Sequence, residues 1–254
     1  MNYVQLRRGD CLPAVGVLQK LLNRTGFRLV PDGNFGPRTE SAVKEFQRLY
    51  RLRTDGVVGE KTWPRLAPKD LPIVDCIDVF DPSLYEMENK DISAAGGNPI
   101  VIGGMCNGVE EAVHQIASVA RKTFLLRFHG HGAPGVAGLG FGQGEIGWGE
   151  HANIGNQNFN QLEPVLTRLR PIFGPYGNIQ FMHCSTGQGH NGQLLLHRIA
   201  DALGVPVTGA LQTQYGGGQY TFQYEGPTFT AIPEGASLAD WCHGIPDFPG
   251  LSLA

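Results

Sequence analysis

A cysteine and a histidine are the residues in this sequence whose types and spacing could carry out covalent chemistry. Cys184 follows a short apolar run at residues 178–182, and His131 follows another at residues 123–128. A thiol acts as a nucleophile when a base lies within hydrogen-bond reach or when its pKa is lowered. The two residues are 53 positions apart (184 − 131), so only the fold can bring them together. The pattern indicates a candidate nucleophile and a candidate base.

Both apolar runs have the features of buried strands, because a few apolar residues are bounded by glycine-rich turns. In an open parallel sheet, functional groups collect beyond the carboxyl ends of the strands. Strands that end in histidine and cysteine would therefore deliver an imidazole and a thiol to one crevice. Alternating strands and amphipathic helices predict an α/β domain whose mainly parallel sheet is sandwiched by helices. We expect strands at 73–80, 99–102, 123–128, 179–182 and 205–210, helices at 109–120, 159–169 and 193–203, and a hairpin or edge strands at 220–232.

Neighbouring side chains compete for a place in this site. His129 and His131 alternate on one extended segment, so they point to opposite sides and only one can easily face Cys184. We prefer His131, because a glycine-rich His-Gly-x-x-Gly pattern starts there, and we keep His129 as the second candidate. Cys106, which follows another predicted strand, is the second candidate thiol.

The first 67 residues carry an internal repeat of loop and helix. The pattern Asp-Gly-x-x-Gly-x-x-Thr begins at Asp32 and again at Asp55, 23 positions later (55 − 32). Its glycines permit tight turns, and Thr39 stands where a helix N-cap belongs. Apolar residues at helical spacing precede the first loop, at 15–22. The repeat predicts a small all-α domain at residues 1–67.

This stretch closely resembles the small three-helix peptidoglycan-binding domain at the ends of many bacterial and phage cell-wall hydrolases. The resemblance covers residues 3–67 and rests on Leu18-Gln19, Gly26 and the two glycine loops with their following apolar positions. It implies binding of the peptide or glycan of peptidoglycan. The residues expected to contact this polymer are Asp32, Phe35, Thr39, Phe46, Gln47, Asp55 and Val58. For the aspartates and glycines of the two loops, a role in loop architecture is the simpler interpretation.

Residues 99–215 resemble the caspase-fold cysteine peptidase clan. The resemblance rests on an apolar strand followed by His131-Gly132, a second apolar strand ending in Cys184, and a helix and strand over residues 192–210. A histidine about 50 residues before the cysteine is the caspase order. The resemblance implies Cys184 as nucleophile, His131 as general base or acid, and the N–H groups of Gly132 and Cys184 as oxyanion hole, without a cofactor. Met-His before Cys184 replaces the caspase Gln-Ala, so specificity for aspartate is not implied.

A zinc-dependent amidase or peptidase is the first alternative. A His-x-His pair on a strand can present ligands to zinc, and the imidazoles available are His129, His131, His183 and His190. Against zinc, strand alternation separates the first two, and no aspartate or glutamate has motif spacing. Glu145 and Glu150, between the two strands, could orient an imidazole, although solvated loop carboxylates are the simpler interpretation.

Two further alternatives remain. A non-catalytic peptidoglycan-binding protein is possible on the same fold, because fold does not determine function. A papain-like wall peptidase is disfavoured, because that family places its cysteine before its histidine.

Composition narrows the partners and the location. A net charge of −3 argues against nucleic-acid binding, which needs a basic surface. Five cysteines without CxxC spacing argue against a zinc knuckle or a disulfide framework. The sequence contains no run of 18 apolar residues, so we expect no membrane insertion. The N-terminus lacks the apolar segment of a signal peptide. We expect synthesis in the cytoplasm and action at the cell wall or periplasm after leaderless export or lysis.

The expected organisation has three parts. Residues 1–67 form the peptidoglycan-binding domain, residues 68–98 a proline-containing linker and lead-in, and residues 99–254 the caspase-like α/β domain. The expected partners are peptidoglycan and a peptide or protein substrate, with an inhibitor protein as a further candidate.

Overall fold

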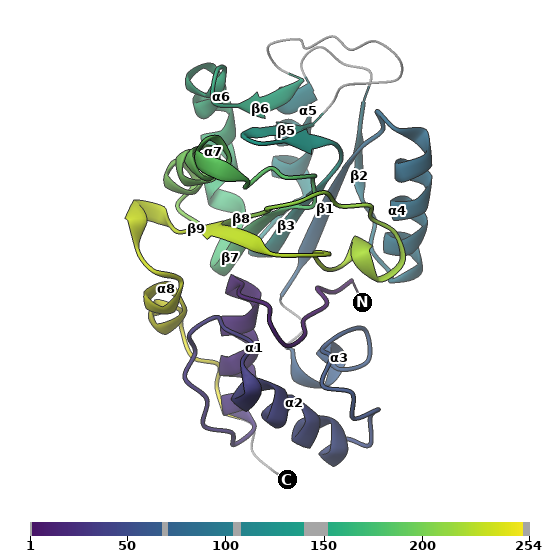
Figure 1. Cartoon of the computed structure of the whole chain (residues 1–254), viewed down its shortest axis with the longest axis vertical. Helices are drawn as coiled ribbons and strands as arrows, with labels where there is room; N and C mark the ends of the chain where they lie inside the picture. Colours follow the sequence, from purple (N-terminus) through teal and green to yellow (C-terminus); the bar gives the residue numbers. More distant parts are fainter. Residues whose placement is uncertain (1, 68–70, 104–107, 140–151, 251–254) are drawn as a thin grey trace.

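The computed structural model describes residues 2–67, 71–103, 108–139 and 152–250, with a helical N-terminal part below an α/β sandwich (Figure 1). The N-terminal part contains three helices, and the described remainder forms a mostly parallel sheet with helices around it. The predicted order of a helical region followed by an α/β region is confirmed. The three N-terminal helices are α1 (Pro13–Arg24), α2 (Pro37–Leu49) and α3 (Trp63–Leu66).

The main sheet places the two candidate strands side by side at its centre. Its strand order is β2-β1-β3-β7-β8-β9; the first five strands run parallel, and β9 runs antiparallel to β8. Because β3 and β7 are parallel neighbours, the residues that follow them emerge at the same edge. The strands are β1 (Ile73–Asp78), β2 (Ile100–Ile102), β3 (Thr123–His129), β7 (Phe173–Phe181), β8 (Val207–Ala210) and β9 (Thr228–Ala231).

Helices pack on both faces of this sheet, which explains why all seven residues of β3 are buried. On one face, three helices form a core with Leu126, Phe128 and Phe181. On the other face, the N-terminal helices share a second core with Phe124 and Leu125. The helices of the first face are α5 (Gly108–Val119), α6 (Phe159–Leu166) and α7 (Gly189–Leu203).

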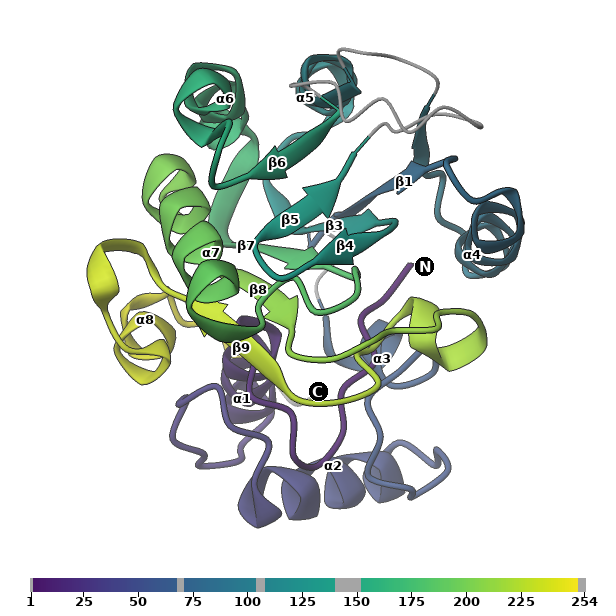
Figure 2. The same ribbon diagram turned by 45° about the horizontal axis from the view of Figure 1, so that its top comes forward.

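A small antiparallel sheet lies between β3 and β7 in the sequence, and Figure 2 shows it beside the end of the main sheet. It contains β4 (Gly132–Ala133), β5 (Val136–Gly138) and β6 (Asn153–Gly155). Gly135, in the turn that joins β4 to β5, has a φ of +79°, a conformation that glycine adopts without strain. This sheet therefore starts directly after the His131 position.

Three segments differ from the predicted elements. Residues 68–98, expected as a linker and lead-in, contain β1 and a helix, α4 (Pro82–Ala94). Residues 220–232, expected as a hairpin or edge strands, contain the end of a short 3-10 helix, η2 (Gly218–Thr221), and the single strand β9. Helix α8 (Leu238–Gly244) was not predicted, and it contacts α1. Among the described helices, none is long and apolar enough to cross a membrane.

Candidate functional site

His131 and Cys184 line the same pocket, which has a volume of about 330 Å³. His131 follows β3 and Cys184 follows β7, so the parallel register of these two strands delivers both residues to one edge. The N-terminal end of α4 forms another part of the lining, and residues 214–216 form a third. The structure thus brings together the thiol and the imidazole preferred from the sequence.

Cys184 is half-buried, and both the N–H and the carbonyl of Gln214 contact its sulfur. The Gln214 N–H donates to Cys184 Sγ, and the thiol in turn can donate to the Gln214 carbonyl, with both heavy-atom distances 3.3 Å. Ser185, the next residue, has a φ of +51°, which is uncommon for a residue with a side chain. Its N–H donates to the Gln212 carbonyl (2.9 Å). Cys184 and Ser185 are therefore both bound to the 212–214 segment.

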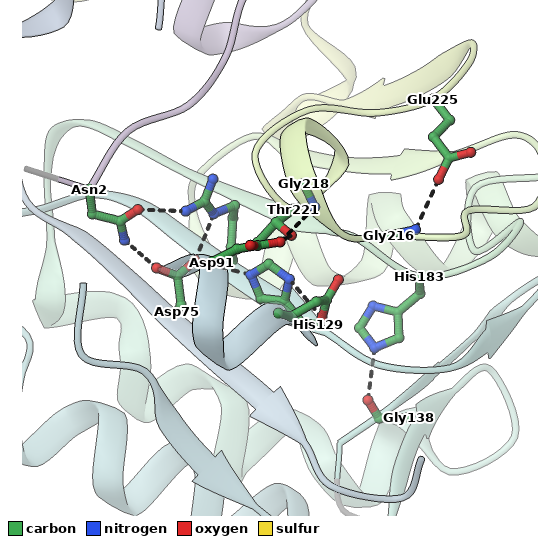
Figure 3. A network of polar contacts seen from close by, with 12 residues as sticks. Asn2, Asp75, Asp91, His129, Gly138, His183, Gly216, Gly218, Thr221 and Glu225 are labelled. Atoms are coloured by element: carbon green, nitrogen blue, oxygen red, sulfur yellow. Dashed lines mark hydrogen bonds and ion pairs between the residues drawn. The ribbon is translucent and has the colours of Figure 1, made fainter. Parts of the chain in front are cut away.

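The part of the pocket wall formed by residues 214–216 is held by a carboxylate. The Gly216 N–H donates to Glu225 Oε1 at 2.9 Å, a contact drawn in Figure 3. The Tyr215 N–H donates to the same oxygen, while the Tyr215 ring remains largely exposed. The backbone of this wall is therefore held in place by hydrogen bonds, and its aromatic side chain is exposed.

Asp81 is the partner of His131, a contact that the sequence pattern did not predict. Asp81 Oδ2 lies 3.4 Å from His131 Nε2, and the Phe80 ring contacts the imidazole edge-on. Asp81 is also the N-cap of α4, since it accepts hydrogen bonds from the N–H groups of Ser83 and Leu84. Hydrogen bonds from Ser83 hold the pKa of the Asp81 carboxyl below its usual range, so a negative charge is maintained beside His131. Cys184, His131 and Asp81 together have the residue types of a nucleophile, a base and an orienting acid.

His129, the second candidate base, belongs to a buried charge network instead of the pocket lining. Its side chain is fully buried, with Nε2 3.0 Å from Asp75 Oδ1 and Nδ1 3.3 Å from Glu88 Oε2. The Glu88 contact is an ion pair whose alignment falls short of a hydrogen bond. Burial alone would lower the pKa of His129, but Glu88 and Asp75 raise it to about 9. His129 is therefore enclosed between two carboxylates and is not among the described lining residues of the pocket, and its catalytic role stays a prediction.

The N-terminal segment closes this network. Arg127 Nε donates to Asp75 Oδ1 (2.7 Å), and its two Nη atoms donate to the Tyr3 carbonyl (2.9 Å) and to Asn2 Oδ1 (3.0 Å). The Asn2 side-chain amide also donates to Asp75, as Figure 3 shows. Burial opposes ionisation of Asp75, but Arg127 and His129 outweigh it and hold its pKa well below the usual range. Each buried charge in this group therefore has an opposite charge or a hydrogen bond beside it.

The four histidines of the zinc alternative have different surroundings. His183 is buried with Nε2 2.8 Å from the Gly138 carbonyl, and burial lowers its pKa to about 3, so this neutral nitrogen donates to the carbonyl. His190 is exposed at the start of α7, and His129 is held by Asp75 and Glu88. Within the described ranges, no three His, Cys, Asp or Glu side chains are grouped as metal ligands.

Other candidates fall outside the pocket or outside the described chain. Gly132 pairs with Ala137 in the small sheet and is not part of the pocket lining, whereas Gly130 is. Its role as an oxyanion-hole donor stays a prediction. Cys106, Glu145 and Glu150 lie outside the residues that the structure describes.

The two repeated loops of the N-terminal part are each built around a buried glutamine. In each loop the glutamine side chain donates to the aspartate and the threonine of the repeat, and its carbonyl oxygen accepts from the following glycine N–H. The matching bonds are Gln19 to Asp32 (2.8 Å) and Thr39 (3.2 Å), and Gln47 to Asp55 (3.0 Å) and Thr62 (3.3 Å). The repeat in the sequence is therefore a repeated hydrogen-bond arrangement.

Most residues expected to contact peptidoglycan are buried inside the N-terminal part. The buried ones are Phe35, Thr39, Phe46, Gln47 and Val58, each at most 3% exposed. Phe35, Thr39, Phe46 and Val58 are enclosed within the domain, whereas Gln47 lines a cavity of about 280 Å³ together with Asp55. A role of these residues in binding peptidoglycan stays a prediction. Thr39 is also not the N-cap, because α2 begins at Pro37 after Gly36. Of the seven, Asp32 is half-buried and Asp55 is exposed.

The comparisons with known proteins all involve limited parts of the chain. Residues 12–66 match the protein family described as "Putative peptidoglycan binding domain". The "Zinc D-Ala-D-Ala carboxypeptidase" of Streptomyces albus G is 45% identical over 42 residues, which are 16% of this chain and 16% of that protein. The "Uncharacterized protein in bpoA1 3'region" of Kitasatospora aureofaciens is 41% identical over 63 residues, 24% of this chain and 53% of that protein.

One solved structure is similar over a comparable length. It is the crystal structure of a peptidoglycan-binding protein from Clostridioides difficile in complex with glutamine hydroxamate, 35% identical with a TM-score of 0.24, covering 24% of this chain and 39% of that one. This chain thus spans about half or less of the length of each of these three relatives. Since the family match and the helical repeat coincide at residues 12–66, the chain carries an N-terminal peptidoglycan-binding domain.

Proposed function

We propose that this chain is a bacterial or phage cysteine hydrolase of the caspase fold that is targeted to the cell wall and cleaves a peptide or amide bond. The observation that carries the proposal is the shared pocket of His131 and Cys184 at the carboxyl edge of β3 and β7. The mostly parallel sheet with helices on both faces supports the fold, and the peptidoglycan-binding domain supports the location. In this proposal, residues 1–67 bind the cell wall, and the rest of the chain catalyses the reaction.

The proposed reaction is acyl transfer through a thioester. His131 takes the proton of the Cys184 thiol, and the sulfur attacks the carbonyl carbon of the scissile bond. His131 then gives this proton to the leaving amine, and water hydrolyses the thioester to a carboxylate and a free thiol. Asp81 stabilises the imidazolium that forms in between, and the Gln214 N–H stabilises negative charge on the sulfur. The N–H groups of Cys184 and Gly132 are the proposed donors to the oxyanion.

A thiol-specific loss of activity tests the proposal. The full chain is incubated with purified sacculi and with synthetic stem peptides, and release of new amino groups is measured. Cys184→Ala is expected to lower kcat by about 10³-fold or more, as removal of a nucleophile does in hydrolases. Cys11→Ala is the matched control, because Cys11 is exposed and far from the pocket lining, and it should retain full activity. Iodoacetamide should inactivate the enzyme, and a chelator should not.

Other outcomes would assign the protein to another class. Inactivation by the chelator with an active Cys184→Ala variant would indicate zinc chemistry and refute the cysteine mechanism. Sedimentation of the full chain with sacculi, without turnover of any substrate, would favour the non-catalytic binding protein, which the family match at residues 12–66 also accommodates.

A further inference from the structure

A second cavity lies between the small sheet, the start of α6 and the start of α7. Its volume is about 540 Å³, larger than that of the pocket with His131 and Cys184. Carboxamide side chains dominate the lining, and no acidic, basic or histidine side chain is among its described lining residues. The six carboxamides are Asn153, Asn156, Gln157, Asn158, Gln161 and Asn191. The cavity is therefore polar, neutral and rich in both hydrogen-bond donors and acceptors.

One of these amides has an unused acceptor. Asn156 Nδ2 donates to the Asn191 carbonyl at 2.8 Å, and this bond fixes the orientation of the amide because a carbonyl can only accept. The other end, Asn156 Oδ1, is buried without a hydrogen-bond partner in the described structure. Buried acceptors in folded proteins almost always have a donor. Because this oxygen is enclosed, a ligand hydroxyl or amide N–H in the cavity could supply one only after the Asn156 side chain turns outward.

The cavity is built against the loop that carries Cys184. Its wall includes Gly135, where an added Cβ would lie 2.9 Å from the Asn191 carbonyl oxygen and 3.1 Å from Asn156 Nδ2. The Gly135 N–H is 3.3 Å from the carbonyl of Thr186, which is two residues after Cys184. A polymer bound in the cavity would therefore contact a turn that is hydrogen-bonded to the loop carrying the proposed nucleophile.

We propose that this carboxamide-lined cavity binds the glycan strand of peptidoglycan, as a neutral chain of N-acetylated sugars. The proposal rests on the wall-directed function above and assigns the sugar, rather than the peptide, to this cavity. Hydroxyl and acetamido groups match amide donors and acceptors. A stem peptide carries carboxylates and amines, which bind best to opposite charges. The described lining provides none.

Direct binding to a sugar oligomer tests this assignment. The full chain with Cys184→Ala, which removes turnover, is titrated calorimetrically with a β-1,4-linked N-acetylglucosamine hexamer. The double variant Gln157→Ala/Gln161→Ala should bind it about tenfold more weakly, because two hydrogen-bonding side chains are lost. Both residues are exposed, and neither side chain hydrogen-bonds within the described structure, so the fold should persist. Gln219→Ala, an exposed amide in η2, is the control and should leave the Kd unchanged.

The result separates this proposal from the hydrolase. An unchanged Kd in the double variant, with an unchanged melting temperature, would overturn the glycan site. Loss of affinity for a sugar-free stem peptide in the double variant, with the hexamer unaffected, would overturn it in favour of a peptide site. Because these measurements use the inactive Cys184→Ala chain, their outcome does not depend on whether Cys184 is a nucleophile.

Discussion

Asp81 connects two functions at a single residue, since it caps α4 and also lies beside His131. Asp81→Asn should separate them, because asparagine is as good an N-cap as aspartate but carries no charge. We expect kcat to fall by about tenfold, the effect of about 1.4 kcal/mol of lost imidazolium stabilisation, with KM nearly unchanged. Initial rates across substrate concentrations give this split.

Ser83→Ala is the matched control for Asp81→Asn. It removes the hydroxyl that donates to Asp81 Oδ1 (2.6 Å) and leaves the carboxylate facing His131. Its kcat should stay within about twofold of the unmodified chain. Equal losses of kcat in both variants would mean that Asp81 acts only through the helix start, and the orienting role would be abandoned.

Two buried histidines give the stability a predictable dependence on pH. The folded state raises the pKa of His129 to about 9, above the value near 6.5 in an unfolded chain, so its contribution is complete below pH 6.5 and is lost as pH rises toward 9. The folded state lowers the pKa of His183 to about 3, so stability is also lost as pH falls from 6.5 toward 3. The free energy of unfolding, from urea titrations, should therefore peak near pH 6.5 and fall by on the order of 1–3 kcal/mol by pH 9. A curve that rises between pH 6.5 and pH 9 would contradict the charged state of His129.

At the level of helices and strands, periodic apolar patterns were sufficient where burial is strong. Strands β3 and β7 and helices α5 and α7 were predicted, because their apolar residues recur at strand or helix spacing. Helix α4 was missed, because it buries only Glu88 and Ile92 and so lacks an apolar stripe. Its Asp81-Pro82 start is a cap followed by proline at N1, a local signal that could have revealed the helix.

The candidate site was predictable only in part, for a related reason. Strand alternation correctly separated His129 from His131, since it is a local property of an extended backbone. The partners of these histidines come from elsewhere in the sequence. Asp75, on β1, bonds His129 on the neighbouring strand β3, and Asp81, at the start of α4, lies beside His131. Such pairings depend on the order of the strands and the position of the helix, so local sequence patterns do not predict them. The same holds for the carboxamide-lined cavity, which three separate elements form.

Taken as a whole, the molecule buries its two functional parts against each other. The apolar residues of α1 and α2 share one core with Phe124 and Leu125 of β3, and Met182 follows β7 in the same core. Helix α8 returns to α1, where the buried Lys20 ammonium donates to the Ile245 carbonyl (2.6 Å) and to Asp247 (2.8 Å). A peptidoglycan-binding domain that shares its core with the sheet has no separate hydrophobic interior. Heat should therefore unfold the whole chain together.

Calorimetry of the full chain should show one cooperative transition, and Lys20→Met should move all of it. Methionine keeps the apolar stem but loses the hydrogen bonds to the end of α8, at a cost of about 1–3 kcal/mol, which lowers Tm by roughly 2–4 °C per kcal/mol for a chain of this size. Lys44→Met is the matched control, because Lys44 forms an exposed i,i+4 pair with Glu40, worth about 0.5 kcal/mol or less. Two separate transitions, with only the first shifted by Lys20→Met, would mean that the wall-binding domain unfolds independently. One shared transition would mean instead that wall binding and the geometry of the Cys184 pocket are maintained by the same core.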